Sequence, residues 1–264
     1  MKSMLLALWR YRHFMLSSIR GELKGRFARS RLGALWFILH PLAQATIFAL
    51  VLAEVLGAKL PNIDNKAAYA IYLMAGMAAW GLFSEILNRS TTVFIEYAGT
   101  LKKIAFPRLC LPVIVWGSAL LTHALLLLAI AVVFLFFGHF PGVAWLAVPL
   151  GVLLISMFAF GLGVMLGVLN VFSRDVGQVM GILLQIWFWL TPIVYTYEVI
   201  PKTLRWLTDL NPMAPLVLIY QDALLFNRWP EFEALLAPAA IATILFIMSF
   251  IFFRRAGPEL VDAL

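Results

Sequence analysis

The longest charge-free segment of the chain covers residues 109–173, which is 65 positions without Lys, Arg, Asp or Glu. A membrane-spanning helix needs about 20 apolar residues, so this segment is too long for one crossing at about 1.5 Å per residue. The turn-forming sequence GHFPG at 138–142 divides it into two spans. The composition agrees with a membrane protein, since 63% of the residues are hydrophobic and only 12% are charged, against about 25% charged in soluble domains.

Other charge-free segments complete a set of six predicted spans, at about residues 32–56, 67–88, 109–137, 143–173, 176–197 and 234–253. We therefore predict an all-α, polytopic membrane protein with six transmembrane helices. An N-terminal amphipathic interface helix (1–31) precedes the membrane domain (32–264). Within that domain, a connecting segment covers 89–108, and a re-entrant helical hairpin lies between helices 5 and 6, at 198–232.

Lys and Arg are distributed unequally between the two sides of this topology. With a cytoplasmic N-terminus, 15 of them lie on the inner side and five on the outer side. Because basic residues concentrate in cytoplasmic loops, both termini are predicted to be cytoplasmic. The net charge of +7 is confined to short segments between spans, which is typical of a membrane protein rather than of a nucleic-acid-binding surface.

The N-terminal segment has the pattern of a helix that lies in the membrane interface. Its apolar side chains fall on one predicted stripe, formed by Trp9, Leu16, Ile19, Leu23 and Phe27. Basic side chains lie toward the other side, as in interfacial amphipathic helices. The alternative is a basic anchor that only orients the first span.

The connecting segment 89–108 is predicted to hold a short helix on the cytoplasmic side. Ser90, Thr91 and Thr92 can cap its start, and Phe106-Pro107 ends it. A candidate docking surface for a soluble partner is formed by exposed apolar residues, namely Phe94, Ile95, Tyr97, Leu101 and Ile104. The alternative is a connector that rests on lipid headgroups.

The outer segment 198–233 is larger than a simple loop. Residues 210–221 are uncharged, contain Asn211-Pro212 and Pro215, and are too short to span a membrane. Broken backbone of this kind is tolerated at membrane depth only where protein or water covers it. We therefore expect a gate or lid over the outer mouth.

Few polar groups are available for membrane chemistry: His40, Gln44, Glu54, Glu85, His123 and Asp175. Glu85 precedes Arg89 by four positions, which favours an ion pair on a helix. The sequence contains no HExxH motif and no Cys/His cluster, so no metal site or metal catalysis is predicted. It also lacks a GxxxxGK[ST] loop, so if ATP drives this protein, another chain binds it. The single Cys110 excludes an intramolecular disulfide and is expected to be an inert, buried thiol.

Aromatic residues mark the first and fifth predicted spans: Trp36, Phe37, Trp187, Trp189 and Tyr195. Aromatic residues at span ends usually form the interfacial belt. Trp187 and Trp189 lie well inside their span, however, and flat amphipathic rings can pack on sugar faces. A carbohydrate path is therefore an open alternative.

Four stretches, taken in order, resemble the membrane subunit of type-2 ABC exporters for lipid-linked polysaccharides, the O-antigen, capsule and teichoic-acid permeases. They are GELKGRFARSRLGALWFILHPL (21–42), LKKIAFPRLCLP (101–112), RDVGQVMGILLQIWFWLTPIVYTYEVIP (174–201) and LNPMAPLVLIYQDALL (210–225). The similarity covers nearly the whole chain. It departs from the family pattern at Arg31-Leu32, where an apolar residue often replaces the Arg.

The resemblance implies a homodimer in the bacterial inner membrane, paired with two ATP-binding subunits that hold ATP and Mg, with no cofactor in this chain. Its cargo would be polyprenyl-linked polysaccharide, and no nucleic acid is involved. Segment 89–108 would be the coupling segment and 198–232 the periplasmic gate hairpin.

The resemblance also assigns roles to residues. Coupling to the ATPase would involve Arg20, Glu22, Lys24, Arg26, Arg29, Phe94, Tyr97, Lys102, Lys103, Phe106 and Arg108. The substrate path would be lined by Trp36, Phe37, Gln44, Trp187, Trp189 and Tyr195. The periplasmic gate would contain Asn211, Pro212, Pro215 and Tyr220.

Three alternatives remain at this point: a type-2 ABC permease for a small lipid or drug, an integral-membrane transferase acting on polyprenyl-linked sugars, and a scaffold subunit. The transferase would need a carboxylate cluster that this sequence lacks. Under the exporter hypothesis, residues 20–31 form a mechanical hinge between the interface helix, the ATPase and the first span.

Overall fold

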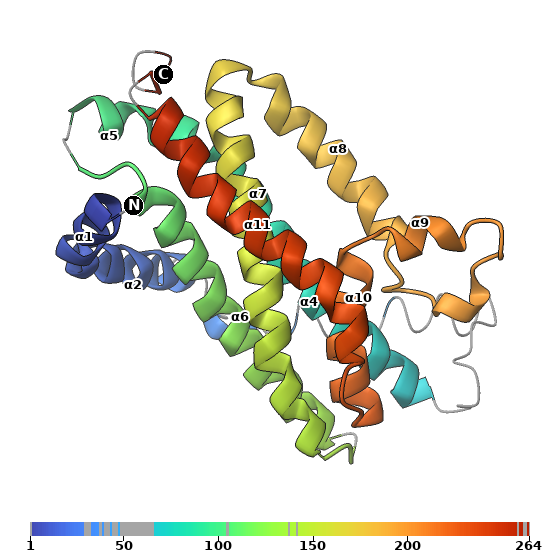
Figure 1. Ribbon diagram of the computed structural model, residues 1–264. Helices are drawn as coiled ribbons and strands as arrows, with labels where there is room; N and C mark the ends of the chain where they lie inside the picture. The colour runs from blue at the N-terminus through green and yellow to red at the C-terminus, as the bar shows by residue number, and fades with distance from the viewer. Residues whose placement is uncertain are drawn as a thin grey trace.

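The computed structural model describes residues 2–28, 33–36, 39, 43, 47, 66–103, 106–136, 138–140, 142–257, 259–260 and 263. Within these ranges the ordered elements are all helical and no strand occurs (Figure 1), which confirms the predicted all-α class.

Ten α-helices, three short 3-10 helices and one π-helical turn make up the described part of the chain. The α-helices are α1 (Lys2–Arg10), α2 (Arg12–Ala28), α4 (Lys66–Glu96), α5 (Ala98–Lys103), α6 (Cys110–Phe136), α7 (Val148–Phe172), α8 (Asp175–Leu190), α9 (Arg205–Asp209), α10 (Met213–Gln221) and α11 (Phe232–Ala256). The short elements are η1 (Gly33–Leu35), η3 (Val143–Ala147), η4 (Tyr197–Val199) and the π-helical turn η5 (Asp222–Phe226).

Four of the described helical segments are long and apolar enough to cross a membrane: Ala68–Glu96, Cys110–Leu135, Val143–Phe172 and Phe232–Ala256. They coincide with the second, third, fourth and sixth predicted spans. Most of the first predicted span, 32–56, lies outside the described residues. The total of six spans therefore stays a prediction.

The helix in the region of the fifth predicted span is shorter than expected. We predicted 176–197, whereas α8 ends at Leu190 after 16 residues. The chain leaves the helix at Thr191, whose backbone is extended, because Pro192 disfavours the helical conformation in the residue before it and has no N–H to continue the ladder. Residues 191–195 then form turns and bends.

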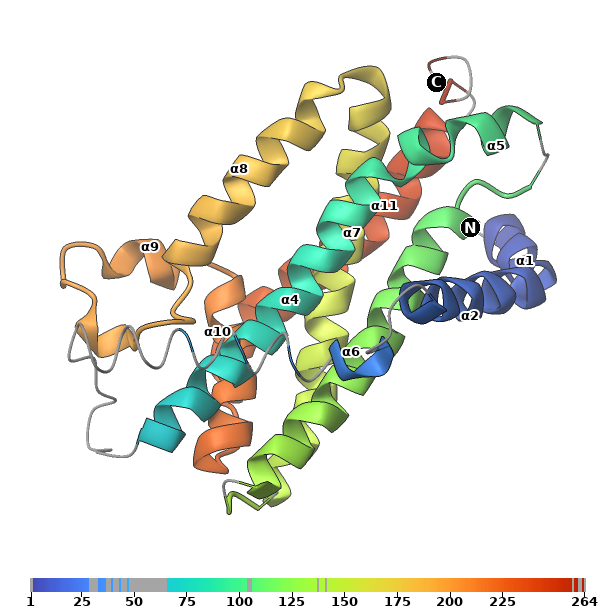
Figure 2. The same cartoon turned by 180° about the vertical axis from the view of Figure 1, so that it is seen from behind.

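Helix α7 lies at the centre of the bundle, between α4 and α11 (Figure 2). Two glycines permit this close packing. A Cβ at Gly167 would lie 2.3 Å from the carbonyl oxygen of Ser90 in α4, and a Cβ at Gly161 would lie 2.6 Å from the carbonyl carbon of Leu245 in α11. Small residues allow helix backbones in a membrane to approach in this way.

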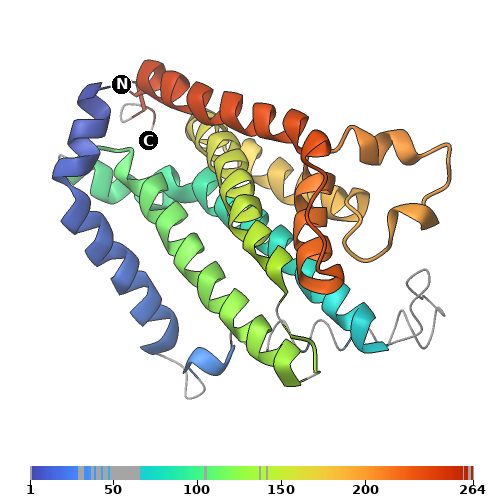
Figure 3. The ribbon, with the colours of Figure 1, turned by 60° about the horizontal axis from the view of Figure 1, so that its bottom comes forward.

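Several elements that are distant in sequence meet at one end of the bundle. Helix α1, helix α5 and the end of α11 lie there together, and α2 runs beside α6 (Figures 1 and 3). The turn at residues 106–109 leads into α6 at the same end.

The N-terminal segment forms two helices, α1 and α2, and its position in the membrane interface stays a prediction. The helix is interrupted by a turn at Tyr11, and the side chains of Trp9 and Leu16 are 68% and 50% exposed. Ile19, which belongs to the same predicted stripe, lies on the face of α2 that meets α6, where its side chain occupies the space beside Gly117.

Candidate functional site

A polar junction joins helix α2 to two of the long helices. Arg89 in α4 donates a hydrogen bond from Nη2 to Oε2 of Glu22 in α2, at 2.6 Å. Ser118 in α6 donates its hydroxyl proton to the same Glu22 oxygen, at 2.7 Å, and Arg89 Nη1 lies 3.4 Å from the Ser118 hydroxyl oxygen. We call these three residues the Glu22–Arg89–Ser118 junction.

The junction is partly shielded from water. The side chains of Arg89 and Glu22 are 29% and 23% exposed, so their pairing is stronger than that of a fully exposed ion pair. Glu85 adds a weaker contact to Arg89 at 3.5 Å, which confirms the predicted pair four residues apart. The structure thus fixes α2 against α4 and α6 at one point through charge-assisted hydrogen bonds.

Ser90, Thr91 and Thr92 do not begin a new helix, contrary to our prediction. Helix α4 continues through them to Glu96. The Thr91 hydroxyl donates to the Leu87 carbonyl within the same helix, at 2.8 Å. Such a bond to the carbonyl four residues back satisfies the hydroxyl without a cap. The segment predicted as a separate connector is therefore the end of a long helix followed by the short helix α5.

The predicted docking surface is only partly exposed. Phe94 and Leu101 are buried, so their assignment to an exposed surface is wrong. Phe94 stacks on Phe253 of α11, with ring centroids 5.7 Å apart, because α4 and α11 both pack against α7 here. Among the other predicted docking residues, Tyr97 is exposed and Ile95 is half-buried, whereas Ile104 lies outside the described residues. Exposed side chains of the same segment include Glu96, Thr100, Lys102 and Lys103.

The remaining predicted coupling residues are distributed around this end of the bundle. Phe106 packs against Phe14 of α2 with ring centroids 5.7 Å apart, and Arg108 donates a hydrogen bond to the carbonyl of Gly257 after α11. Arg20 and Lys24 are exposed on α2. Helix α2 also contains Arg26, whereas Arg29 lies outside the described residues. The structure thus brings Glu22, Phe106 and Arg108 to one end of the bundle.

Trp187 and Trp189, two of the predicted path residues, point in different directions from α8. Trp187 packs inside an aromatic cluster with Trp80, Phe83 and Phe158, at centroid distances of 6.5, 5.1 and 6.0 Å. Trp189 is 59% exposed. Trp187 therefore supports the packing of α8 on α4 and α7, while Trp189 is available to a ligand or to another chain.

The other predicted path residues are less closely grouped. Tyr195 donates its hydroxyl proton to the Trp189 carbonyl, and Trp36 is 52% exposed just after η1. Phe37 and Gln44 lie outside the described residues.

Asn211 connects the end of α8 to the start of α10. Its side-chain oxygen accepts hydrogen bonds from the Trp187 indole N–H at 2.7 Å and from the Met213 backbone N–H at 3.0 Å. Its amide nitrogen donates to the Thr191 hydroxyl at 2.9 Å and to the Leu190 carbonyl at 3.3 Å. A buried amide with this set of partners fixes the backbone where α8 stops.

Helix α10 is a buried short helix, not an exposed lid. Tyr220 is fully buried and its hydroxyl lies 2.9 Å from Nε2 of His123 in α6. Pro212 precedes the first turn and Pro215 lies within it, where a missing N–H costs little. A gate role for this segment stays a prediction, because its predicted residues serve here to hold α10 among α4, α7 and α11.

Sequence reasoning missed the set of hydrogen bonds that holds residues 192–195. Tyr72 and Gln221 donate to the Pro192 carbonyl, Tyr72 also donates to the Tyr195 carbonyl, and Tyr69 donates to the Val194 carbonyl. These donors satisfy carbonyls that the break in α8 leaves without helical partners. A signal existed in the two tyrosines three residues apart on one face of α4, opposite the Thr-Pro break.

The segment from Tyr197 to Leu210, which follows this break, forms contacts within itself. The Tyr197 hydroxyl donates to the Asp209 carboxylate at 2.9 Å, and this hydrogen bond raises the pKa of Tyr197. Trp206 and Leu210 on and after α9 are 56% and 74% exposed. The segment thus presents apolar side chains outward while its polar groups pair internally.

Comparison with known proteins gives the family. The model described as "ABC-2 type transporter" matches residues 15–225. The O-antigen export system permease protein RfbA of Klebsiella pneumoniae is 32% identical over 206 residues, 76% of each chain. RfbA of Myxococcus xanthus is 27% identical over 259 residues, 97% of each chain. The polysialic acid transport protein KpsM of Escherichia coli is 23% identical over 205 residues, 77% of this chain and 78% of that protein.

The matched region begins within α2 and ends within η5, so it contains the Glu22–Arg89–Ser118 junction, α5 and α8. It also contains every residue of the four sequence stretches on which the resemblance depends. Because the family model covers most of the chain and the relatives cover three quarters or more of it, the chain belongs to the ABC-2 type transporter family of membrane proteins.

Proposed function

We propose that this chain is the channel-forming membrane subunit of an ATP-driven exporter that moves lipid-linked polysaccharide of the O-antigen type across the bacterial inner membrane. The family and the apolar helices establish a multi-pass membrane transport subunit. The substrate class is supported by relatives named as O-antigen export permeases and as a polysialic acid transport protein.

The Glu22–Arg89–Ser118 junction is the observation that carries the coupling part of the proposal. It ties α2 to α4 and α6, at the end of the bundle where α5 exposes Lys102 and Lys103. Two ATP-binding partner subunits would contact α5 and α2 on the cytoplasmic side and would hold ATP and Mg. A displacement of α2 by the ATP-binding subunits would then be transmitted to α4 and α6 together, because the junction bonds α2 directly to both helices.

The homodimer in this proposal would use the exposed face of α8. Its apolar side chains that point outward recur at helical spacing: Val179, Ile182, Leu183, Ile186, Trp189 and Leu190. A second copy placed against this face would bury it and set Trp189 near the dimer axis. The path for the polymer would then run between the two copies, with an aromatic ring available to pack on sugar faces.

A type-2 ABC permease for a small lipid or drug is the second candidate. It shares the family, the partner ATPase and the apolar α8 face. The relatives' names favour the polysaccharide exporter, and the fate of the polymer in a deletion strain distinguishes the two.

Deletion of this chain is expected to trap lipid-linked polymer on the cytoplasmic face of the inner membrane. The assay fractionates glycolipid from the deletion strain and measures surface glycan with and without a plasmid copy of the wild-type chain. Loss of surface glycan with accumulation of long intracellular polymer supports the exporter. Normal surface glycan in the deletion strain contradicts it.

Reversing both lysines of α5, Lys102→Glu with Lys103→Glu, is expected to lower export at least about tenfold, because like charges at a docking surface cost several kcal/mol. ATP hydrolysis by the partner would no longer be coupled to export. The matched control is Lys202→Glu, an exposed lysine on the opposite, outer segment. Unchanged export and unchanged assembly with the ATPase in the double variant would refute the docking role of α5.

A further inference from the structure

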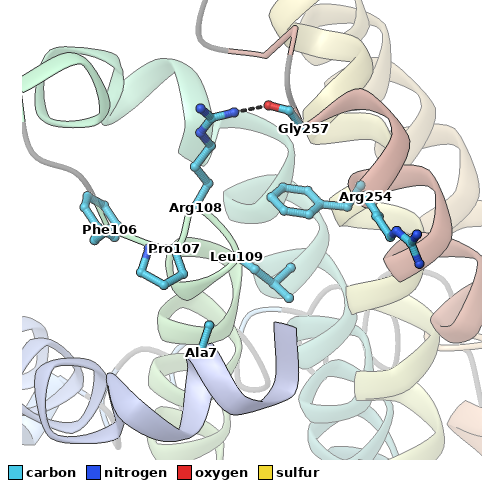
Figure 4. A pocket seen from close by; sticks show the side chains of 8 residues that line it. Ala7, Phe106, Pro107, Arg108, Leu109, Arg254 and Gly257 are labelled. Atoms are coloured by element: carbon cyan, nitrogen blue, oxygen red, sulfur yellow. Dashed lines mark hydrogen bonds between the residues drawn. The ribbon is translucent and has the colours of Figure 1, made fainter. Parts of the chain in front are cut away.

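An open cavity of about 360 Å³ lies at the end of the bundle where α1, the turn before α6 and the end of α11 meet (Figure 4). Eight residues from these three segments line it: Ala7, Phe106, Pro107, Arg108, Leu109, Phe253, Arg254 and Gly257. Its volume falls near the lower end of the range for small-molecule sites, about 300–1,000 Å³.

The cavity combines an apolar wall with two cations that form no ion pair within the described part of the chain. The aromatic rings of Phe106 and Phe253 and the side chain of Leu109 supply the apolar surface. Arg108 donates to the Gly257 carbonyl, and neither Arg108 nor Arg254 forms an ion pair with any described carboxylate. None of the eight lining residues is acidic.

The two arginines approach the cavity differently. In Figure 4, Arg108 extends along one wall toward Gly257, whereas the guanidinium of Arg254 points away from Arg108 along the outside of α11. Arg254 is exposed, and a long side chain of this kind can turn its head group while its stem stays on apolar surface. The Arg108 guanidinium is therefore already positioned at the cavity as a hydrogen-bond donor. The Arg254 guanidinium is a second donor, which can reach a bound anion by a rotation of its side chain.

The position of the cavity along the helices indicates the level of lipid phosphates. Arg254 and Arg255 lie in the last turn of the apolar α11, and Phe106-Pro107 stands just before the apolar α6. Charged residues at the end of a span mark the boundary between hydrocarbon and headgroups. A ligand here would have its acyl chains in the bilayer and its head group between the arginines.

We propose that this cavity binds one anionic phospholipid of the surrounding leaflet, with the phosphate held by Arg108 and Arg254. Basic pockets between transmembrane helices on the cytoplasmic side take acidic lipid head groups in this way. A zwitterionic lipid fits less well, because none of the eight described lining residues offers a carboxylate to pair with its ammonium group. The lipid would join α1, the turn into α6 and α11 at their common end. The inference does not depend on the polysaccharide as cargo.

The test uses the full-length chain, purified with its ATP-binding partner subunits, and measures bound phosphatidylglycerol by native mass spectrometry. Arg108→Ala and Arg254→Ala are each expected to weaken binding about fivefold, and the pair about 25-fold. Arg255→Ala is the matched control, because Arg255 is the exposed neighbour on α11 that does not line the cavity. Ala7→Trp, which fills the cavity and keeps both cations, is expected to abolish binding even if an arginine variant fails to assemble.

Several results would overturn the proposal. They are an equal loss of binding in the Arg255→Ala control, full binding in Ala7→Trp, and equal binding of phosphatidylethanolamine to the wild-type complex. Competing probes identify the source of the phosphate. Displacement of phosphatidylglycerol by an equimolar polyprenyl phosphate would assign the cavity to the cargo lipid, and displacement by inorganic phosphate alone would reduce it to an anion site. Persistence of phosphatidylglycerol against both probes supports the proposal.

Discussion

Reversing the charge of Glu22 to Arg is expected to reduce surface polysaccharide at least about tenfold while the chain stays inserted in the membrane. The wild-type carboxylate accepts hydrogen bonds from Arg89 at 2.6 Å and from Ser118 at 2.7 Å. Charge-assisted bonds of this kind contribute about 1.5–3 kcal/mol each when shielded, and partial exposure of 23–29% places this pair toward the lower value. In Glu22→Arg two cations face each other instead, so α2 would separate from α4.

The decisive measurement exchanges the two charges. Because Arg89 also lies 3.5 Å from Glu85, a glutamate at position 89 would meet a second carboxylate. All variants are therefore made with Glu85→Gln, which also serves as the reference. Glu22→Arg and Arg89→Glu should each lose export, and their combination should recover to within about threefold of the reference, since the attraction is restored with opposite orientation.

Export and ATP hydrolysis are measured together in these variants, to separate loss of coupling from loss of the complex. An intact complex that hydrolyses ATP without exporting polymer is the expected phenotype of each single variant. The charge-reversal control is Glu259→Arg, an exposed acid after α11. Failure of the exchange to recover export, with the complex intact, would show that the junction does not transmit motion from α2 to the spans.

The junction illustrates which part of the site can be predicted from sequence. Glu85 and Arg89 are four residues apart, so their pair follows from helix geometry alone. The stronger partner, Glu22, is 67 residues away from Arg89, and Ser118 is 96 residues away from Glu22. No local pattern encodes such a contact, because it depends on how α2 lies against the bundle.

The membrane spans were predictable because charge is excluded from hydrocarbon, and four predicted spans correspond to long apolar helices in the structure. By contrast, the sequence did not allow us to predict which side chains of each span face the protein interior. In a soluble protein the polar face of a helix marks its outside, but a helix in lipid is apolar on every side. Trp189 in α8 is exposed although its sequence context is as apolar as that of buried positions. Phe94 was expected to be exposed for another reason, because segment 89–108 was predicted to lie outside the membrane, whereas α4 continues through it and Phe94 packs on Phe253.

The sequence also contains a signal for close helix packing that our predictions did not use. Gly163 and Gly167 form a GxxxG pattern in α7, and the structure places both against Ser90 of α4. Such a pattern marks a helix face where backbones approach. It would have identified the α4–α7 contact, which the distribution of large apolar residues along α7 does not reveal.

Gly167→Ala is expected to separate α4 from α7 and to lower the melting temperature of the purified protein by about 3–10 °C, which corresponds to about 1–3 kcal/mol of overpacking. The added methyl group would lie 2.3 Å from the Ser90 carbonyl oxygen, and that atom belongs to the backbone of a continuous helix. It cannot turn aside as a side chain could. Gly163→Ala should cost less, because its methyl group would lie 2.7 Å from the Ser90 Cβ atom rather than against the carbonyl.

The matched control for Gly167→Ala is Gly181→Ala, which is expected to leave the melting temperature unchanged or to raise it. Gly181 in α8 has no atom within 4 Å of the position of an added Cβ, so Gly181→Ala adds helix propensity, worth about 0.5–1 kcal/mol, without a clash. Thermal unfolding in the same detergent should therefore place Gly181→Ala at or above the wild type and Gly167→Ala well below it. Equal melting temperatures for the two variants would mean that α4 and α7 can move apart freely at this point. A loose contact there would also disconnect Arg89 from the central helix, because Ser90 is its immediate neighbour, and motion of α2 could then not reach α7 through α4.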